Sequence, residues 1–175
     1  MNAILTVQHT EKYKAILELH DRNKRIIRTE VFIGKNGVTQ NHVEGDGKTP
    51  LGIYELGTIF GTHSMKKLKI DNYIRINKNL YWVDDIKSKY YNKLVDITNT
   101  KKDWTSAEHL IEYPQQYEYA IEIKVNPNNI PGKGSAIFLH CSVKKPTSGC
   151  IAIDTKYMKK IIEFVNKNLN SIVIM

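Results

Sequence analysis

The sequence Ser135-Ala-Ile-Phe-Leu-His140-Cys-Ser-Val-Lys-Lys-Pro146-Thr-Ser-Gly-Cys150-Ile-Ala-Ile153 contains two short apolar runs joined by a polar loop. The first run ends at His140, and a Thr-Ser-Gly turn leads into the second run at Cys150. Short apolar runs bounded by turn residues are typical of buried β-strands. Because the loop is short, we expect the two strand ends to lie side by side and His140 to reach Cys150.

Strand patterns continue on both sides of this stretch. Residues 117–125 alternate between large apolar side chains and a second set that includes Glu and Lys, which predicts a strand with one buried face. Residues 14–20 and 25–33 flank the polar turn Asp21-Arg22-Asn23 and predict a hairpin. Further strands are predicted at 51–56, 72–83 and 171–175.

Two helices are also predicted. Thr105-Ser-Ala-Glu108 has the spacing of a capping box, which predicts a short helix that runs to about Tyr113 and stops before Pro114. Asp154 is placed to cap a longer helix, whose apolar stripe is typical of a face packed on the core. That stripe consists of Tyr157, Met158, Ile161, Ile162, Val165 and Leu169. The residues thus predict one mostly β domain with a few helices.

Length and composition fit a single domain that covers residues 1–175. Hydrophobic residues make up 41% and charged residues 25% of the chain, which excludes a disordered tail, a collagen-like rod and a disulfide-dense miniprotein. The sequence has no run of 18 apolar residues, so we expect no membrane-spanning segment. The net charge of +8 favours anionic partners, but the basic residues are spread along the chain and specify none.

The pairing of Cys150 with His140 is the pattern that indicates chemistry. A thiolate is a nucleophile, and an imidazole that accepts its proton activates it. Gly149 permits a tight turn whose backbone N–H groups point at a developing oxyanion, and Ser148 is placed to orient the imidazole. The competing interpretation is inert packing of a buried Cys against a buried His.

Cys141 follows His140 directly and should point to the opposite face of the strand, where core packing is its expected role. A disulfide between Cys141 and Cys150 is conceivable, but two cysteines neither require nor exclude one. His140, Cys141 and Cys150 lack the spacing of a metal site and a fourth ligand, so we expect no metal.

Four segments occur in a particular order along most of the chain. They are Gly45-Asp-Gly-Lys-Thr-Pro-Leu-Gly-Ile-Tyr54, Trp82-Val-Asp-Asp85 with Tyr91-Asn92, Gly134-Ser-Ala-Ile-Phe-Leu-His140, and Thr147-Ser-Gly-Cys-Ile-Ala152. Together they resemble the L,D-transpeptidase catalytic domain, the YkuD-type family of bacterial cell-wall enzymes. The Ser-Gly-Cys block with an upstream His is the most specific part of this resemblance.

The resemblance implies a β-sandwich-like fold with a few peripheral helices, and peptidoglycan stem tetrapeptides as partners. It implies that Cys150 attacks the third residue of the stem, expels D-alanine and forms a thioester, with His140 as base and then acid. An amine would resolve the thioester to a cross-link, whereas water would make the protein an L,D-carboxypeptidase. The family needs no metal or organic cofactor.

The sequence departs from the commonest family motif, Ser-His-Gly-Cys followed by an apolar residue and Arg or Asn. Ser148 stands in place of that His and Ala152 in place of that Arg, and the gap from His140 to Cys150 is shorter. The missing Arg removes a clamp for substrate carboxylates. The remaining basic candidates for that role are Lys48, Arg75, Lys144 and Lys145.

The glycine-rich loop around Gly45-Asp-Gly-Lys-Thr49 lacks the spacing of a nucleotide-binding loop and precedes a strand, so we reject nucleotide binding. We expect the loop to form a turn or to line the substrate groove, and aromatic residues such as Trp82 and Tyr81 to stack on substrate or pack in the core. The residues expected to contact substrate are Lys48, Thr49, Tyr54, Trp82 and Thr147.

Three functional hypotheses remain. The first is a peptidoglycan cross-linking enzyme of the cell envelope or periplasm, although the N-terminus lacks the features of a secretion signal. The second is a hydrolase of stem peptides, including one delivered to rival cells as a toxin. The third is a non-catalytic module that binds an anionic polymer, with nucleic acid disfavoured. The oligomeric state is not predicted.

Overall fold

The computed structural model describes residues 3–64, 70 and 73–175. Most of its strands join one sheet. These strands are β1 (Ile4–Glu11), β2 (Lys14–Asp21), β3 (Lys24–Phe32), β6 (Gly52–Gly61), β7 (Tyr73–Arg75), β11 (Ala120–Ile123), β12 (Phe138–Cys141), β13 (Ile151–Ile153) and β14 (Ser171–Ile174). Within the described residues the sheet has the order β11-β12-β13-β3-β2-β1-β14-β6-β7.

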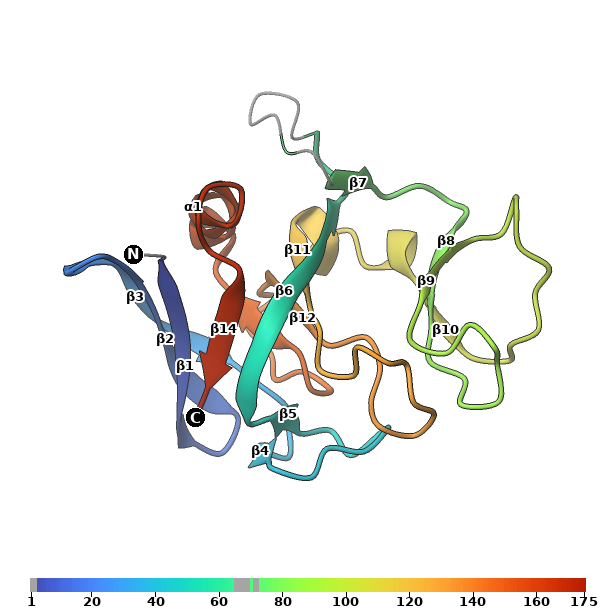
Figure 1. Cartoon of the computed structure of the whole chain (residues 1–175), viewed down its shortest axis with the longest axis horizontal. Coiled ribbons are helices and arrows are strands. Elements are labelled where there is room, and N and C mark those ends of the chain that lie inside the picture. The colour runs from blue at the N-terminus through green and yellow to red at the C-terminus, as the bar shows by residue number, and fades with distance from the viewer. Residues whose placement is uncertain (1–2, 65–69, 71–72) are drawn as a thin grey trace.

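This sheet closes on itself, because β11 pairs with β6 as well as with β12. The closure joins every strand of the sheet except β7 into a ring, in which the parallel pair β12 and β13 lies beside the β2–β3 hairpin. The parallel pairing of β1 with β14 brings strands from the two ends of the chain side by side (Figure 1). The expected mostly β, sandwich-like fold is confirmed.

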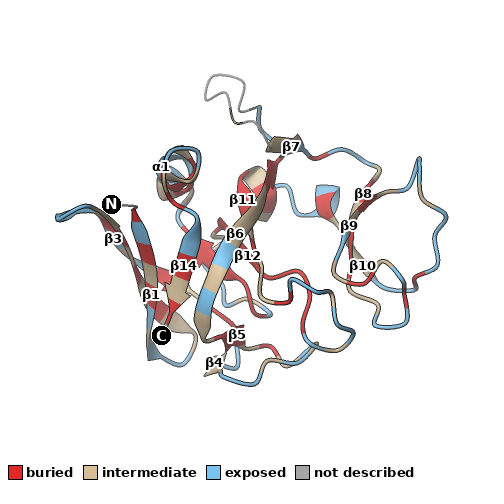
Figure 2. Ribbon diagram, in the orientation of Figure 1, coloured by how far each residue is buried: buried red, intermediate tan, exposed pale blue. Residues whose placement is uncertain are grey.

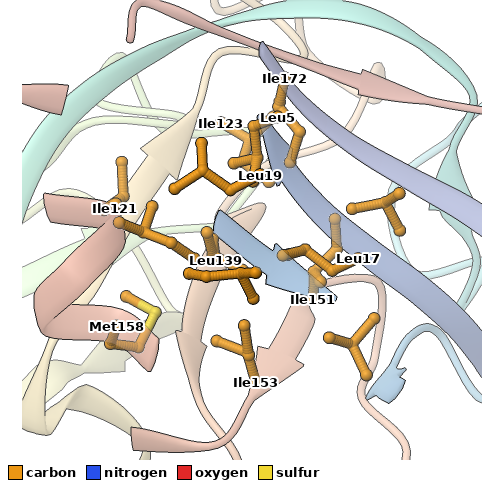
Figure 3. Packing of buried hydrophobic residues seen from close by; sticks show 14 of the residues in the cluster. Leu5, Leu17, Leu19, Ile121, Ile123, Leu139, Ile151, Ile153, Met158 and Ile172 are labelled. Atoms are coloured by element: carbon orange, nitrogen blue, oxygen red, sulfur yellow. The ribbon is translucent and has the colours of Figure 1, made fainter. Parts of the chain in front are cut away.

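The main hydrophobic core lies inside this ring. Leu5, Leu17, Leu139 and Ile151 are each fully buried there, and Figure 3 shows their side chains converging from different strands. Alternation along each strand directs every second side chain into the core, as on β2, where Ala15, Leu17 and Leu19 are buried. Burial on this scale is the main favourable term in folding.

The helix α1 (Thr155–Val165) covers one side of this core. Asp154 caps it by accepting a hydrogen bond from the Lys156 N–H at 3.0 Å, and Met158, Ile161 and Ile162 are buried. The predicted cap and apolar stripe are therefore confirmed, although the helix ends at Val165. No helix in the described part of the chain has the length and hydrophobicity needed to cross a lipid bilayer.

A smaller sheet lies beside the ring and forms the right-hand part of Figure 1. It contains β8 (Leu80–Val83), β9 (Leu94–Asp96) and β10 (Ala107–His109), in the order β10-β8-β9. A second hydrophobic cluster joins the two sheets and includes Phe60, Trp82, Phe138 and Cys150. A short parallel pair, β4 (Val38–Thr39) and β5 (Thr49–Pro50), frames the glycine-rich loop. Figure 2 shows that the long loops of the right-hand part are largely exposed.

Most predicted strands are confirmed, with shifted limits. The hairpin is β2–β3, residues 51–56 belong to the longer β6, and 171–175 contain β14. The predicted strand 72–83 is two strands, β7 and β8, and its residue 72 lies outside the described residues. The predicted strand 117–125 is shorter, because residues up to Glu118 form the 3₁₀ turn η3 (Gln116–Glu118) before β11 begins.

The helix predicted from Thr105 is wrong. The backbone N–H and hydroxyl of Thr105 donate to the Asp85 carboxylate, at 2.7 and 2.8 Å, instead of capping a helix. The chain then pairs with β8 as β10 and forms only the short 3₁₀ turn η2 (Leu110–Glu112). Tertiary pairing overrides the local capping pattern, and as a result Glu108 occupies a strand.

Candidate active site

Cys150 lies in the turn that leads into β13, at the wall of a cavity of about 400 Å³. Its side chain is held by the backbone of the neighbouring strand region. The Phe138 N–H donates to the Cys150 Sγ at 3.3 Å, and the thiol donates to the Ala136 carbonyl at 3.2 Å. The sulfur thus has a fixed position at the end of β12, with one face toward the cavity.

Two threonines hold the turn that carries Cys150. The Thr147 hydroxyl donates to the Cys150 carbonyl at 2.6 Å and accepts the Gly149 N–H at 3.1 Å. The fully buried Thr49 donates to the Gly149 carbonyl at 2.7 Å and accepts the Gly34 N–H. Gly149 has a φ of +147°, and a Cβ there would lie 2.9 Å from Ile137 and 3.0 Å from the Lys48 carbonyl. The turn therefore requires glycine at this position.

His140 lies on the same face of β12 as Phe138, two residues along the strand. The parallel register of β12 and β13 places His140 opposite Ala152. Cys150 precedes Ala152 by two residues, so it is the diagonal neighbour of His140 on the adjoining chain segment. The His140 Nδ1 lies 2.9 Å from the Cys141 carbonyl. Because a carbonyl only accepts, Nδ1 carries the proton and Nε2 has the free lone pair of a base.

Burial keeps both groups neutral in the resting protein. It raises the pKa of the Cys150 thiol well above its usual value, and the nearby Glu108 carboxylate adds to this rise. The N–H groups of Phe138 and of Cys150 itself oppose it. Burial also lowers the pKa of His140 to about 4, against the hydrogen bond to Cys141. The arrangement suits a proton transfer that accompanies nucleophilic attack rather than a preformed ion pair.

Part of the wall of this cavity is acidic. Glu44, Asp84 and Glu108 all line it, from the glycine-rich loop, the end of β8 and β10 respectively. Burial raises the pKa of Glu108 to about 7, and the carboxylates of Asp84 and Glu44 add to the rise. The Tyr117 hydroxyl donates to Glu108, and the Tyr117 ring packs edge-on against His140 with centroids 5.7 Å apart.

Comparison with protein families decides what kind of domain this is. The model of the L,D-transpeptidase catalytic domain, YkuD, matches residues 3–174. The chain belongs to the L,D-transpeptidase catalytic domain family. This membership indicates an L,D-transpeptidase-type catalytic domain. No curated protein sequence matches the chain significantly.

A solved structure supports the fold of this L,D-transpeptidase domain. The crystal structure of the helical cell shape determining protein Pgp2 from Campylobacter jejuni is similar, with a TM-score of 0.53 at 14% identity. A mutant of the same protein matches with a TM-score of 0.49 at 15% identity. Each comparison covers 99% of this chain and 47% of the Pgp2 chain, so the L,D-transpeptidase domain spans about half the length of Pgp2.

The L,D-transpeptidase domain brings some of the predicted site residues together. Cys150 and the exposed Ser148 both line the cavity, whereas His140 lies behind it in the cluster of Tyr117 and Phe138. Gly149 shapes the turn, but its N–H is bound by Thr147. None of the basic candidates Lys48, Arg75, Lys144 and Lys145 is in the cavity lining.

None of the residues predicted to contact substrate is in the lining of this cavity, and their roles in binding stay predictions. Thr49 and Thr147 hold the turn from within the protein. Trp82 is buried against Phe60 and Phe138, and its Nε1 donates to Asn92 at 3.1 Å. Tyr54 donates to the Leu51 carbonyl at 2.7 Å, and neither it nor Lys48 lines the cavity.

The two cysteines are separate. Both are free thiols, and Cys141 packs in the main core on the opposite face of β12 from His140, as predicted. The described residues contain no group of three His, Cys, Asp or Glu side chains that could hold a metal ion.

Sequence reasoning missed the acidic wall. Glu108 was assigned to a capping box, and Glu44 and Asp84 were not singled out within the quoted motifs. Asn92, which belongs to the quoted Tyr91-Asn92 pair, accepts from Trp82 and from the Ala136 N–H and so connects β8 to the segment beside Cys150. Of the three acidic residues only Asp84 lies in a quoted family-like segment, and Glu44 directly precedes another, so the sequence held little signal for the acidic wall.

Proposed function

We propose that this domain is a cysteine acyltransferase that cross-links peptidoglycan stem peptides at the cell envelope, where this polymer lies. The supporting observation is the Cys150 thiol, fixed at a cavity wall on the segment that runs alongside the strand of the buried His140, in a chain of the L,D-transpeptidase family. An inert structural cysteine would not need a turn held by two threonines and a glycine at positive φ.

In the acylation step, the Cys150 sulfur attacks the L-centre carbonyl carbon of the third stem residue. A C–S bond forms while the thiol proton passes to the His140 Nε2. The C–N bond to the terminal D-alanine then breaks, and His140 returns the proton to the leaving amine. The product is a thioester, and we expect the Cys150 N–H, which acts on the thiol in the resting protein, to stabilise the intermediate oxyanion.

In the second step, the side-chain amine of another stem attacks the thioester carbonyl. The new C–N bond replaces the C–S bond, and His140 moves the amine proton to the departing sulfur. If water attacks instead, the products are a trimmed stem and the same free thiol. Both reactions use the same residues, and the acceptor alone decides between cross-linking and carboxypeptidase activity.

The test is incubation of purified disaccharide-tetrapeptide with the wild type and with Cys150→Ala, followed by mass spectrometry of the products. We expect the wild type to release D-alanine and form dimers, and Cys150→Ala to do neither. Cys141→Ala is the matched control, because it removes the other buried thiol and keeps the carbonyl that binds His140. Its activity should be retained.

The products distinguish the alternatives. Tripeptide without dimer would replace cross-linking with carboxypeptidase activity. Turnover that persists in Cys150→Ala would refute the thioester mechanism. Folded wild-type protein that binds the polymer and releases no D-alanine would favour the binding module instead.

A further inference from the structure

The charge of the cavity is opposite to the charge of the protein. The chain has a net charge of +8, yet three carboxylates line the cavity beside Cys150 and none of its described lining residues is Lys or Arg. The one lining histidine, His42, faces the Asp46 carboxylate at 3.1 Å. Substrate carboxylates would be repelled at this wall, so the wall is suited to a cationic group.

Two polar atoms of the wall have unused hydrogen-bonding capacity. Ser135 is 8% exposed and lines the cavity, and its Oγ makes no hydrogen bond of ordinary geometry within the described residues, although it lies near enough to Tyr91 to oppose part of the rise that burial causes in the Tyr91 pKa. The Asp84 Oδ1 is also buried and has no partner in the described part of the chain. Buried polar atoms are rarely left unsatisfied, and both of these belong to residues at the cavity.

The other two carboxylates are held by tyrosines. Tyr91 donates to Glu44, and Tyr117 donates to Glu108. Each tyrosine donates a single proton, so the carboxylates keep further acceptor capacity. The wall thus presents acceptors from three separate chain segments around one volume.

We propose that the wall formed by Glu44, Asp84 and Glu108 binds a primary ammonium group of the stem peptide, and so selects stems whose diamino acid carries a free side-chain amine. The inference rests on the proposed function, because it places the substrate at Cys150. An ammonium group offers three donors and no acceptor, which matches a wall rich in acceptors. Its charge would relieve the mutual repulsion of the carboxylates in a site partly shielded from water.

The first experiment measures binding to Cys150→Ala protein with all 175 residues, so that turnover does not interfere. Three tetrapeptide stems are compared by calorimetry: one with a free side-chain amine, one with that amine monomethylated, and one with it acetylated. The first two keep the charge and the third loses it. We expect acetylation to weaken binding about tenfold or more, and monomethylation to change it little.

Variants then test whether the wall is responsible. Asp84→Asn and Glu108→Gln, each added to Cys150→Ala, should lose the preference for the charged stems. Both replacements preserve the shape of the side chain and remove its charge. Glu44→Gln is the substitute variant if one of the two does not fold. Glu112→Gln is the matched control, because Glu112 is close in sequence to Glu108 but its side chain is 66% exposed. It should keep the preference.

The ammonium group that binds the wall can belong to the acyl donor or to the acceptor. Turnover by protein that retains Cys150 distinguishes these two sources. If it belongs to the acyl donor, acetylation of the donor slows thioester formation, read as a mass increase of the protein. If it belongs to the acceptor, the bound ammonium passes one proton to a wall carboxylate before the neutral amine attacks; thioester formation is then unchanged, and the rate of aminolysis by an added amine falls in Asp84→Asn and Glu108→Gln. Either result supports the wall as an ammonium site.

Equal affinity for the charged and acetylated stems would overturn the inference, as would a preference that persists in both wall variants. Failure of the proposed function looks different, because the wild type would then release no D-alanine from any of the three stems. Release of D-alanine without discrimination among the stems would reject the ammonium site alone.

Discussion

His140 makes the stability of the protein depend on pH in a predictable direction. Its folded-state pKa is lowered to about 4 by burial, whereas in the unfolded chain it is near 6.5. Between these values the unfolded chain binds a proton that the folded chain does not, so the contribution of His140 to stability is lost as the pH falls from 6.5 toward 4.

We therefore predict that the stability of the His140→Gln variant depends less on pH than the stability of the wild type. The free energy of unfolding of the wild type, relative to His140→Gln, should fall by roughly 2 kcal/mol between pH 7 and pH 5. Urea unfolding at the two pH values measures the difference. A constant gap between the two proteins would mean that His140 is not buried as described.

Glu108 should make the stability of the protein depend on pH in the opposite direction. Its folded-state pKa is raised to about 7, so its contribution to stability is fully present below pH 4.5 and is lost as the pH rises through 7. Relative to the wild type, Glu108→Gln should gain roughly 2 kcal/mol between pH 5 and pH 8. The same urea titration tests it, and a gap between the two proteins that stays constant from pH 5 to pH 8 would contradict the burial of Glu108.

At the scale of the elements, the turn before β13 depends on the backbone of Gly149. Gly149→Ala would place a methyl group 2.9 Å from Ile137 at a φ of +147°, and we expect it to cost roughly 2–3 kcal/mol of stability and to displace the thiol. Gly132→Ala is the matched control, since Gly132 also has a positive φ but has nothing within 4 Å of its added methyl group.

Thermal and urea unfolding of the two glycine variants separate the cost of the backbone conformation from the cost of steric clash. The cost in Gly132→Ala reports the backbone conformation, and the excess in Gly149→Ala reports contact with Ile137 and the Lys48 carbonyl. Equal losses in the two variants would show that the turn before Cys150 has room to adjust.

The sequence predicted those strands and helices whose local residue pattern favours the same structure as their contacts with the rest of the protein. The β2–β3 hairpin and α1 have strong periodicity and their own turn or cap, and both form as expected. Thr105–Glu108 has an equally good local pattern, but Asp85 binds the supposed cap and β8 supplies a pairing edge, neither of which is visible locally. Long-range partners therefore account for the failure.

The candidate site also has a part that the sequence predicted and a part that it did not. Cys150, Ser148 and His140 are close in sequence, so their proximity follows from one strand, loop and strand. The acidic wall comes from segments far apart in the chain, and a single sequence does not show that they meet. Thr49 and Trp82 were assigned to substrate by motif, whereas their hydrogen bonds lie within the protein.

For the whole molecule, stability should depend on the closure of the large sheet. β14 lies between β1 and β6, and its Ile172 is fully buried. Ile172→Ala should cost roughly 2–5 kcal/mol, because it removes core contacts and leaves a cavity. Val173→Ala, in the same strand but on its less buried side, should cost clearly less. Chemical unfolding measures both, and equal costs would contradict the described packing of β14.

The position of β14 also has a consequence for how the chain acquires its structure. During synthesis β1 and β6 are both made long before β14, the strand that joins them. Until β14 is available, each of these strands has an edge with unpaired backbone groups, which is a template for aggregation. Contacts between residues so distant in the chain form slowly. A ribosome-bound or truncated chain that lacks β14 should therefore depend on chaperones far more than the released protein does.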